Sequence, residues 1–238
     1  MVLARVFALL ILLLSPGVCT NEPAVLSSTY ESAGLLSVDI ENRHDAPITG
    51  FLIETTVFHK QKKKATLYKY FDATVNVPND HPIEKGARRT VHLLPSLSAS
   101  PDAPFIVLTG VLVQDGKTFG TSSGIEYLIV RRRAISDVIT AYRAELLNKR
   151  GCGLNEVVTS FQMAAQAARS GAEGETGTTR PARLSAVSQV TDWINTTLLR
   201  VPQDCGTDCV GRVLDHITSG LDFWQRNVAK GLTVEVGQ

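Results

Sequence analysis

Residues 105–124, FIVLTGVLVQDGKTFGTSSG, decide how this chain is organised. The apolar run 105–113 is short and rich in β-branched residues, which is typical of a strand buried on both faces. Asp115 and Gly116 follow it as a strong two-residue hairpin signal, so residues 117–121 are expected to fold back against the run. Small polar residues then end the strand pattern. The sequence therefore predicts that sheet gives way to helix at this point.

Upstream of this stretch, the sequence alternates apolar and polar residues with the period of a half-buried strand. Gly50 interrupts one of these runs and marks a β-bulge. Strands are predicted at residues 24–26, 35–41, 48–58, 65–74, 89–94 and 105–113. Short strands separated by turns indicate an antiparallel, immunoglobulin-like β-sandwich, which we place at residues 24–122.

Downstream of the stretch, apolar residues recur at helical spacing. The apolar stripes lie at residues 125–146, 154–168, 184–198 and 210–228, and residues 170–181 have the composition of a linker. These stripes predict an antiparallel bundle of about four helices at residues 124–231. Residues 232–238 form a tail in which alternation returns, as in a short strand. The predicted fold class is α+β, a sandwich followed by a helical bundle.

The first 20 residues have the features of a signal peptide. Arg5 supplies a positive charge, and residues 6–14 form an apolar run that is shorter than the roughly 20 residues a membrane-spanning helix needs. Lipid anchoring through Cys19 is disfavoured, because bulky Val18 stands where such sites have a small residue. No other run is long and apolar enough to span a bilayer. We expect export to the periplasm or the extracellular space.

The charges nearly cancel, since the chain has 24 basic and 23 acidic residues and Arg5 leaves with the leader. A neutral protein has no general attraction to nucleic acid, so none is expected as a partner. The signs nevertheless segregate: residues 21–58 carry six acids and one base, and residues 59–92 carry eight bases and three acids. We favour cross-strand complementarity as the explanation, each pair contributing roughly 0.2–1 kcal/mol. The alternative is an anion-binding surface at Lys60, Lys62, Lys63 and Lys64.

Three cysteines remain beyond the leader: Cys152, Cys205 and Cys209. In an up-down bundle the loops after the first and third helices lie at the same end, which brings these residues together. A structural disulfide from Cys152 to Cys205 or Cys209 is the favoured interpretation for an exported protein, and a local Cys205–Cys209 bridge is the alternative. If Cys209 is free, it lies at a predicted helix N-terminus, where a thiolate is stabilised. A thiol-redox or other enzyme using Cys209 and neighbouring loop residues is therefore the rival function.

Other motifs give no catalytic assignment. His44-Asp45 and Asp80-His81 adjoin turn prolines and are interpreted as turn caps. Asn195 fits the N-glycosylation pattern, and whether it is used depends on the host. The sequence contains no nucleophile elbow, phosphate-binding glycine loop or zinc-protease helix. We predict no catalytic, cofactor-binding or metal-binding residue.

The run 38–51, VDIENRHDAPITGF, precedes a buried strand that ends in Asp-Gly and an arginine-bearing helix. In this combination the chain resembles a group of secreted bacterial proteins. Those proteins pair an N-terminal immunoglobulin-like sandwich with a helical C-terminal part and have no assigned activity. The resemblance covers mainly residues 35–133 and implies the fold and export, but it transfers no catalytic residue.

These observations predict an exported, non-enzymatic binding or interaction module of the cell envelope. Sandwich scaffolds commonly present surfaces and loops to partners, which is an argument by analogy with the fold. The expected partner is a protein or another envelope component, and no cofactor is expected.

Overall fold

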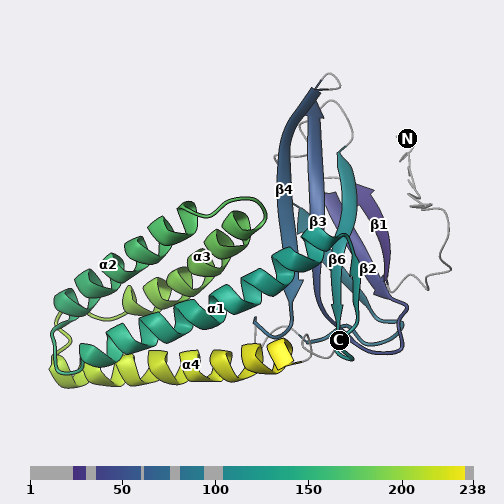
Figure 1. Ribbon diagram of the computed structural model, residues 1–238. Coiled ribbons are helices and arrows are strands. Elements are labelled where there is room, and N and C mark those ends of the chain that lie inside the picture. The colour runs from purple at the N-terminus through teal and green to yellow at the C-terminus, as the bar shows by residue number, and fades with distance from the viewer. Residues whose placement is uncertain (1–23, 31–35, 60–61, 76–80, 94–103, 234–238) are drawn as a thin grey trace, which may run out of the picture. The chain divides into compact units, whose positions relative to one another are not determined.

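The computed structural model describes residues 24–30, 36–59, 62–75, 81–93 and 104–233. In this part of the chain seven strands precede four helices, and every strand pair is antiparallel (Figure 1). The strands are β1 (Ala24–Tyr30), β2 (Leu36–Asn42), β3 (Ile48–His59), β4 (Lys62–Asp72), β5 (Arg88–Leu93), β6 (Phe105–Val113) and β7 (Thr118–Gly120). The helices are α1 (Ser122–Asn148), α2 (Leu154–Glu173), α3 (Thr179–Leu198) and α4 (Thr207–Thr233). The predicted change from sheet to helix is confirmed, because α1 begins directly after β7.

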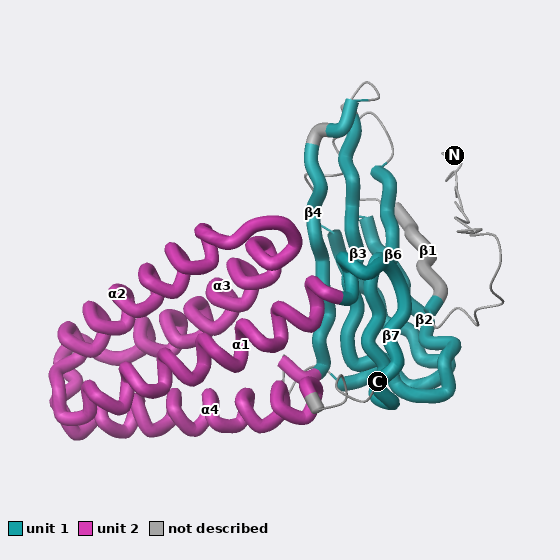
Figure 2. The backbone as a smooth tube through the Cα atoms, in the orientation of Figure 1, with its two compact units in different colours: residues 1–73, 80–125 teal, residues 74–79, 126–238 magenta. Residues whose placement is uncertain are grey.

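The chain divides into two compact units (Figure 2). Unit 1 comprises residues 1–73 and 80–125 and contains the strands, and unit 2 comprises residues 74–79 and 126–238 and contains the helices. The short segment after β4 therefore groups with the helices. Val75 in this segment is fully buried in the helical core. Sequence periodicity could not indicate this, because one residue carries no period.

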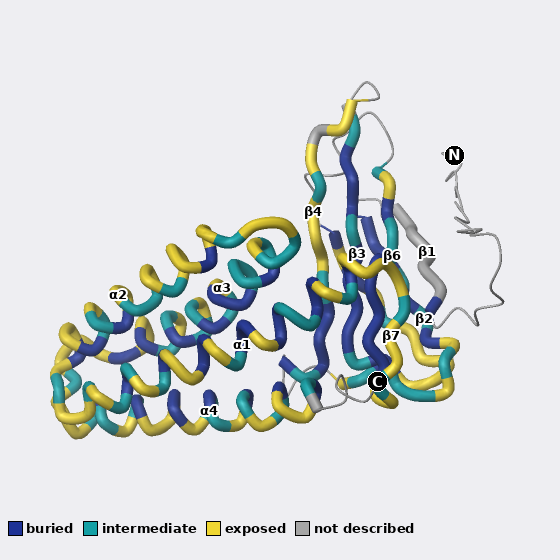
Figure 3. The backbone as a smooth tube through the Cα atoms, viewed as in Figure 1, coloured by how far each residue is buried: buried dark blue, intermediate teal, exposed yellow. Residues whose placement is uncertain are grey.

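Unit 1 contains a three-stranded sheet, β1-β2-β5, and a four-stranded sheet, β4-β3-β6-β7. Both sheets contribute to one hydrophobic core, which includes Val38 and Ile40 of the first sheet and Phe51 and Val111 of the second (Figure 3). Phe51 packs against its cross-strand neighbour Phe71 with 5.1 Å between the ring centroids. The antiparallel α+β architecture is thus as predicted.

Two local predictions for unit 1 are confirmed. The β3–β6 register shifts between Ile48 and Gly50, as expected of a bulge at the glycine. The β6–β7 hairpin turns at Asp115-Gly116, where Gly116 has a φ of 87° that favours glycine. The Asp115 side chain accepts a hydrogen bond from the backbone N–H of Lys117 at 3.1 Å and stabilises the turn.

Close backbone contacts join β6, β7 and the first turn of α1. A Cβ built on Gly124 would lie 2.1 Å from the Thr109 carbonyl oxygen, and a Cβ on Gly110 would lie 2.7 Å from the Gly124 carbonyl carbon. Thr121 caps the helix: its Oγ1 accepts from the Gly124 N–H at 3.1 Å and donates to the Thr109 carbonyl at 3.2 Å. Only glycine allows this approach of Gly124, which belongs to unit 1, to β6.

The turn after β2 is built around Asn42, which is fully buried. Its Nδ2 donates to the carbonyls of Ile83 at 2.7 Å and Ala46 at 3.1 Å, and its Oδ1 accepts from the His44 N–H at 2.8 Å. His44 in turn accepts from the Ala46 N–H at 3.1 Å. The interpretation of His44 as a turn residue is therefore confirmed.

Unit 2 is an antiparallel set of four helices around one core (Figure 1). The loops after α1 and after α3 lie at the same end, as predicted. The predicted linker at residues 170–181 is shorter than expected, because α2 continues to Glu173 and α3 starts at Thr179. The predicted tail strand is also wrong at its start: α4 includes Leu232, and residues 234–238 lie outside the described part.

Aromatic rings and buried arginines fix the helices of unit 2 relative to one another. Tyr142 of α1 meets Phe161 of α2 edge-on, with 5.1 Å between ring centroids. Arg131 is fully buried and donates to Ser185 and Gln189 of α3.

Among the described helices, none combines the length and apolar content that crossing a membrane requires.

Candidate functional site

Strand β4 forms one edge of the four-stranded sheet, because in the described part it pairs only with β3. It has 11 residues, whereas the other outer strands β1, β5 and β7 have seven, six and three. An edge strand presents a row of backbone N–H and C=O groups that its own sheet does not use. β4 therefore offers the longest such row among the described strands.

Both faces of β4 carry exposed residues between positions 62 and 69, namely Lys62, Lys63, Ala65, Leu67, Tyr68 and Lys69. Consecutive strand residues point to opposite faces, yet Leu67 is 37% exposed and its neighbour Tyr68 is 42% exposed. On β3 the residues opposite, Thr55 and Glu54, are buried and half-buried. The exposure therefore belongs to the edge strand itself.

A register shift sets which lysines share a face. Val57 of β3 pairs with Ala65, whereas the next residue, Phe58, pairs with Lys63, so Lys64 is the extra residue of a bulge. Lys63 then shares the face of Tyr68, and Lys62 shares the face of Leu67 and Lys69. Each face of β4 thus combines a lysine with an exposed apolar side chain.

Of the anion-binding candidates, Lys62 and Lys63 are exposed on β4. Lys60 lies outside the described residues, and so does the side chain of Lys64. The structure thus places the two described lysines next to each other along the strand, on opposite faces. It adds Lys69, seven positions after Lys62 and on the same face as Lys62.

The lysines of β4 differ in their partners from the bases at the start of β5 and in the turn before it. Arg88 pairs with Glu41 of β2 at 2.6 Å, and Lys85 pairs with Asp45 at 2.6 Å. The predicted cross-strand complementarity therefore holds for Arg88, whereas Lys85 and Asp45 pair between two turns. Within the described residues, no ion pair involves Lys62, Lys63 or Lys69. The exposed part of β4 is consequently a positive edge.

Sequence reasoning found the lysines of this edge but missed Leu67 and Tyr68. Burial raises the pKa of Tyr68, and the Glu54 carboxylate opposite it raises that pKa further, so the phenol stays neutral. The exposure of Leu67 and Tyr68 had one signal in the sequence. Residues 62–69, KKKATLYK, lack the alternation of apolar and polar residues that the neighbouring strands show.

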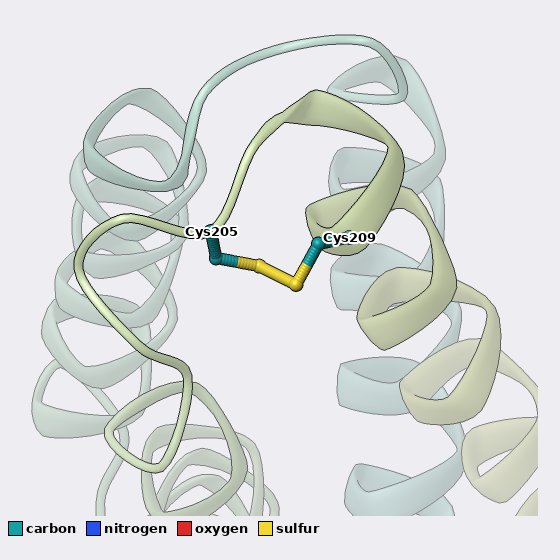
Figure 4. The surroundings of a disulfide bond; sticks show 2 residues. All are labelled: Cys205 and Cys209. Carbon is teal, nitrogen blue, oxygen red and sulfur yellow. A yellow bond between two sulfur atoms is a disulfide. The ribbon is translucent and has the colours of Figure 1, made fainter.

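The cysteines form a second candidate site, at the end of unit 2 that holds the loops after α1 and α3. Cys205 and Cys209 are joined by a disulfide with 5.5 Å between their Cα atoms (Figure 4). Among the described cysteines Cys152 is free, and it packs with Cys205 against the same helical core. The favoured prediction of a bridge from Cys152 is therefore wrong, and the local alternative is found.

The reason for the local bridge is the geometry of the first turn of α4. Cys205 lies two residues before α4 begins at Thr207, and Cys209 lies in the first turn of α4, which brings their Cα atoms within the range that a disulfide spans. Cys209 is therefore not the free thiol that the redox interpretation required.

Glu156 favours the protonated form of the Cys152 thiol. Its carboxylate accepts a hydrogen bond from the thiol and raises the pKa of Cys152, while nearby Lys149 acts weakly in the opposite direction. Lys149 also pairs with Glu156 at 3.2 Å. A shallow depression of about 400 Å³ adjoins this pair. The two charged residues of its lining, Lys149 and Glu156, pair with each other, so the depression presents no unpaired charge to a ligand.

A peptide map tests the observed disulfide. Cleavage after Arg200 and Arg212 leaves Cys205 and Cys209 in one peptide, and cleavage after Arg150 puts Cys152 in another. We expect the non-reduced, alkylated digest to contain peptide 201–212 with a mass two hydrogens below that of its reduced form. We expect peptide 151–169 to carry an alkylated thiol. A covalent adduct of the two peptides would contradict the structure.

The reactivity of Cys152 should follow its raised pKa. A thiol with a raised pKa carries less thiolate at neutral pH, so alkylation by iodoacetamide is expected to be slow and to accelerate as the pH rises. Glu156→Gln removes the carboxylate and is expected to lower the pKa of Cys152 and speed alkylation at neutral pH. Glu175→Gln is the control, and equal rates in both variants would exclude the role of Glu156.

Comparison with known proteins found no matching family model, no matching curated protein and no matching solved structure. The resemblance of residues 35–133 to secreted bacterial proteins therefore remains an expectation. Within the described part, no cluster of three or more His, Cys, Asp or Glu residues is arranged to hold a metal ion.

Proposed function

We propose that this chain is an exported, non-enzymatic binding module of the cell envelope that holds its partner along β4. One observation carries the proposal: residues 62–69 combine a strand edge that pairs with no second described strand, two exposed apolar side chains and three exposed lysines. Exposed apolar groups rimmed by polar ones mark interaction surfaces. A strand edge also pairs readily with another chain unless it is blocked.

We also propose that unit 1 is an immunoglobulin-like sandwich. The support is its strand order, with β1, β2 and β5 in one sheet and β4, β3, β6 and β7 in the other, around a shared core. Immunoglobulin-type sandwiches divide their strands between two antiparallel sheets in this manner, and the variable type carries additional edge strands. β4 would be an edge strand of this kind.

Export is supported by two features. Residues 6–14 form the apolar run of a signal peptide, although this segment lies outside the described residues. The Cys205–Cys209 disulfide is compatible with an oxidising compartment, because disulfides rarely persist in the reducing cytosol.

The thiol-redox alternative is less well supported than the binding function. The sulfur of Cys209 is bonded to Cys205, and the remaining thiol, Cys152, has a raised pKa that reduces its nucleophilic thiolate form. The anion-binding alternative is part of the present proposal, since Lys62 and Lys63 belong to the β4 edge.

Selection from a random peptide library displayed on phage tests the binding proposal. The full chain is immobilised for the selection. Binding of the enriched peptides is then measured to the Leu67→Ser/Tyr68→Ser variant and to a Leu199→Ser control. Leu199 is 85% exposed and lies in unit 2, so the control removes exposed apolar surface elsewhere. We expect enriched peptides to lose binding only to the β4 variant. Equal binding to both variants, or no enrichment, would refute the proposal.

A further inference from the structure

We infer that an extended acidic segment of another protein pairs with β4 and extends the sheet by one strand. This inference rests on the proposed function, because it names the class of partner for the same surface. Strand addition of this type draws affinity from main-chain hydrogen bonds and specificity from alternate side chains.

The open faces of β4 favour strand addition over docking on one face. A strand paired with β4 places its side chains alternately beside the two faces. Leu67 is exposed on one face and Tyr68 on the other, so both sets of side chains on an added strand find apolar neighbours. A partner lying on one face would leave one of these two residues uncovered.

The charge of β4 favours an acidic segment. Lys62, Lys63 and Lys69 are exposed and have no ion-pair partner in the described part, whereas Arg88 and Lys85 have theirs. A carboxylate directly opposite a lysine on an added strand would form a favourable cross-strand pair. The described bases of unit 1 that lie on β4 and have no acidic partner are therefore those that a partner strand would meet.

The same lysines disfavour a second copy of this chain as the occupant. Pairing β4 with β4 of another copy would bring the lysine-rich edges together, and lysines on edge strands are a common device against self-pairing. We therefore assign the partner strand to a different protein.

The order of lysines and apolar residues along β4 predicts the residue pattern of the partner segment. Read against the direction of β4, an antiparallel partner meets Lys69, then Tyr68 and Leu67, then residues 64–66, and finally Lys63 and Lys62. The matching pattern is an acid, two apolar residues, three unspecified residues and two acids. Antiparallel pairing is expected because every described strand pair of this protein is antiparallel.

The probe is a fluorescent peptide with blocked ends and the sequence Glu-Val-Val-Thr-Thr-Thr-Glu-Glu. Its fluorescence anisotropy, measured as the full chain is added, gives the dissociation constant. The reversed sequence tests parallel pairing, and a peptide with Lys in place of Glu tests the charge. We expect the forward acidic peptide to bind at least about tenfold more tightly than the basic one, from summed cross-strand pairs. Equal affinity for the acidic and basic peptides would overturn the assignment of an acidic partner.

N-methylation of the peptide backbone distinguishes strand addition from side-chain docking. In an antiparallel ladder successive residues point their N–H groups to opposite edges, so one alternate set of amides faces β4 and the other faces solvent. Methylation of one set is expected to weaken binding by about tenfold or more, while methylation of the other set leaves affinity unchanged. Equal effects of both sets would overturn strand addition.

Charge reversal on the protein completes the test. The Lys63→Glu/Lys69→Glu variant is expected to bind the acidic peptide about tenfold more weakly. The control variant is Arg200→Glu/Arg226→Glu, which replaces two exposed arginines and changes the net charge equally without altering β4. Equal losses in both variants would show a general charge effect and overturn the inference. Sedimentation tests whether the partner is a second copy of this chain. A dimer that is lost in the Leu67→Ser/Tyr68→Ser variant would overturn the assignment of the partner strand to another protein.

If binding of the library peptides depends on β4 but the acidic peptide does not bind, this inference fails while the proposed binding function stands.

Discussion

Gly124→Ala is expected to destabilise unit 1 by about 3 kcal/mol, because overpacking against rigid backbone has this order of cost. The added Cβ would lie 2.1 Å from the Thr109 carbonyl oxygen, and neither the strand nor the capped helix start can move without breaking hydrogen bonds. The measurement is denaturant unfolding followed by far-UV circular dichroism, which reports the strands as well as the helices.

The matched control for Gly124 is Gly211, a helical glycine of α4 whose Cβ position has no neighbour within 4 Å. Gly211→Ala is expected to be neutral or to stabilise by up to about 1 kcal/mol, since alanine is the better helix former. Similar effects of the two substitutions would show that the close approach of α1 to β6 is not a determinant of stability.

Phe161→Ala is expected to destabilise unit 2 by about 3–5 kcal/mol, the range for removing a large buried aromatic side chain. Phe161 is 1% exposed and its ring meets Tyr142 edge-on, so the substitution removes both apolar burial and a favourable ring contact. The two tryptophans of the chain, Trp193 and Trp224, both lie in unit 2. Tryptophan fluorescence during denaturant unfolding therefore reports this unit alone.

Phe161→Leu is the companion variant and is expected to lose less than half as much stability, because most of the buried volume remains. The exposed Met163, two positions along α2, provides the control Met163→Ala with little expected change. A loss of under about 1 kcal/mol for Phe161→Ala would contradict the burial of this ring in the helical core.

The architecture was predictable because periodicity reports burial directly. The alternation around Val38 follows from one buried face of a strand, and the spacing around Ile135 and Tyr142 follows from one buried face of a helix. Turn chemistry was equally informative at Gly50 and Gly116. The helix ends were less predictable, because the residues of α2 and α3 near the connecting loop are small or polar and leave no apolar stripe.

The candidate sites were only partly predictable, for different reasons. The disulfide was misassigned because the predicted bundle brings all three cysteines to one end and so allows either pairing, whereas the 5.5 Å between the Cα atoms at the start of α4 selects Cys205–Cys209. The lysines of β4 were recognised as a charge run. Leu67 and Tyr68 escaped notice because their residue types suggest burial, and exposure at a sheet edge depends on the order of strands in space.

Backbone hydrogen exchange with and without the acidic peptide tests the central claim, that β4 is the binding surface, most directly. The proposed function and strand addition together predict that bound peptide slows exchange at alternate amides of residues 62–72, those that point away from β3, and leaves the helices of unit 2 unchanged. Slower exchange in unit 2 or along β7, with β4 unaffected, would contradict the claim.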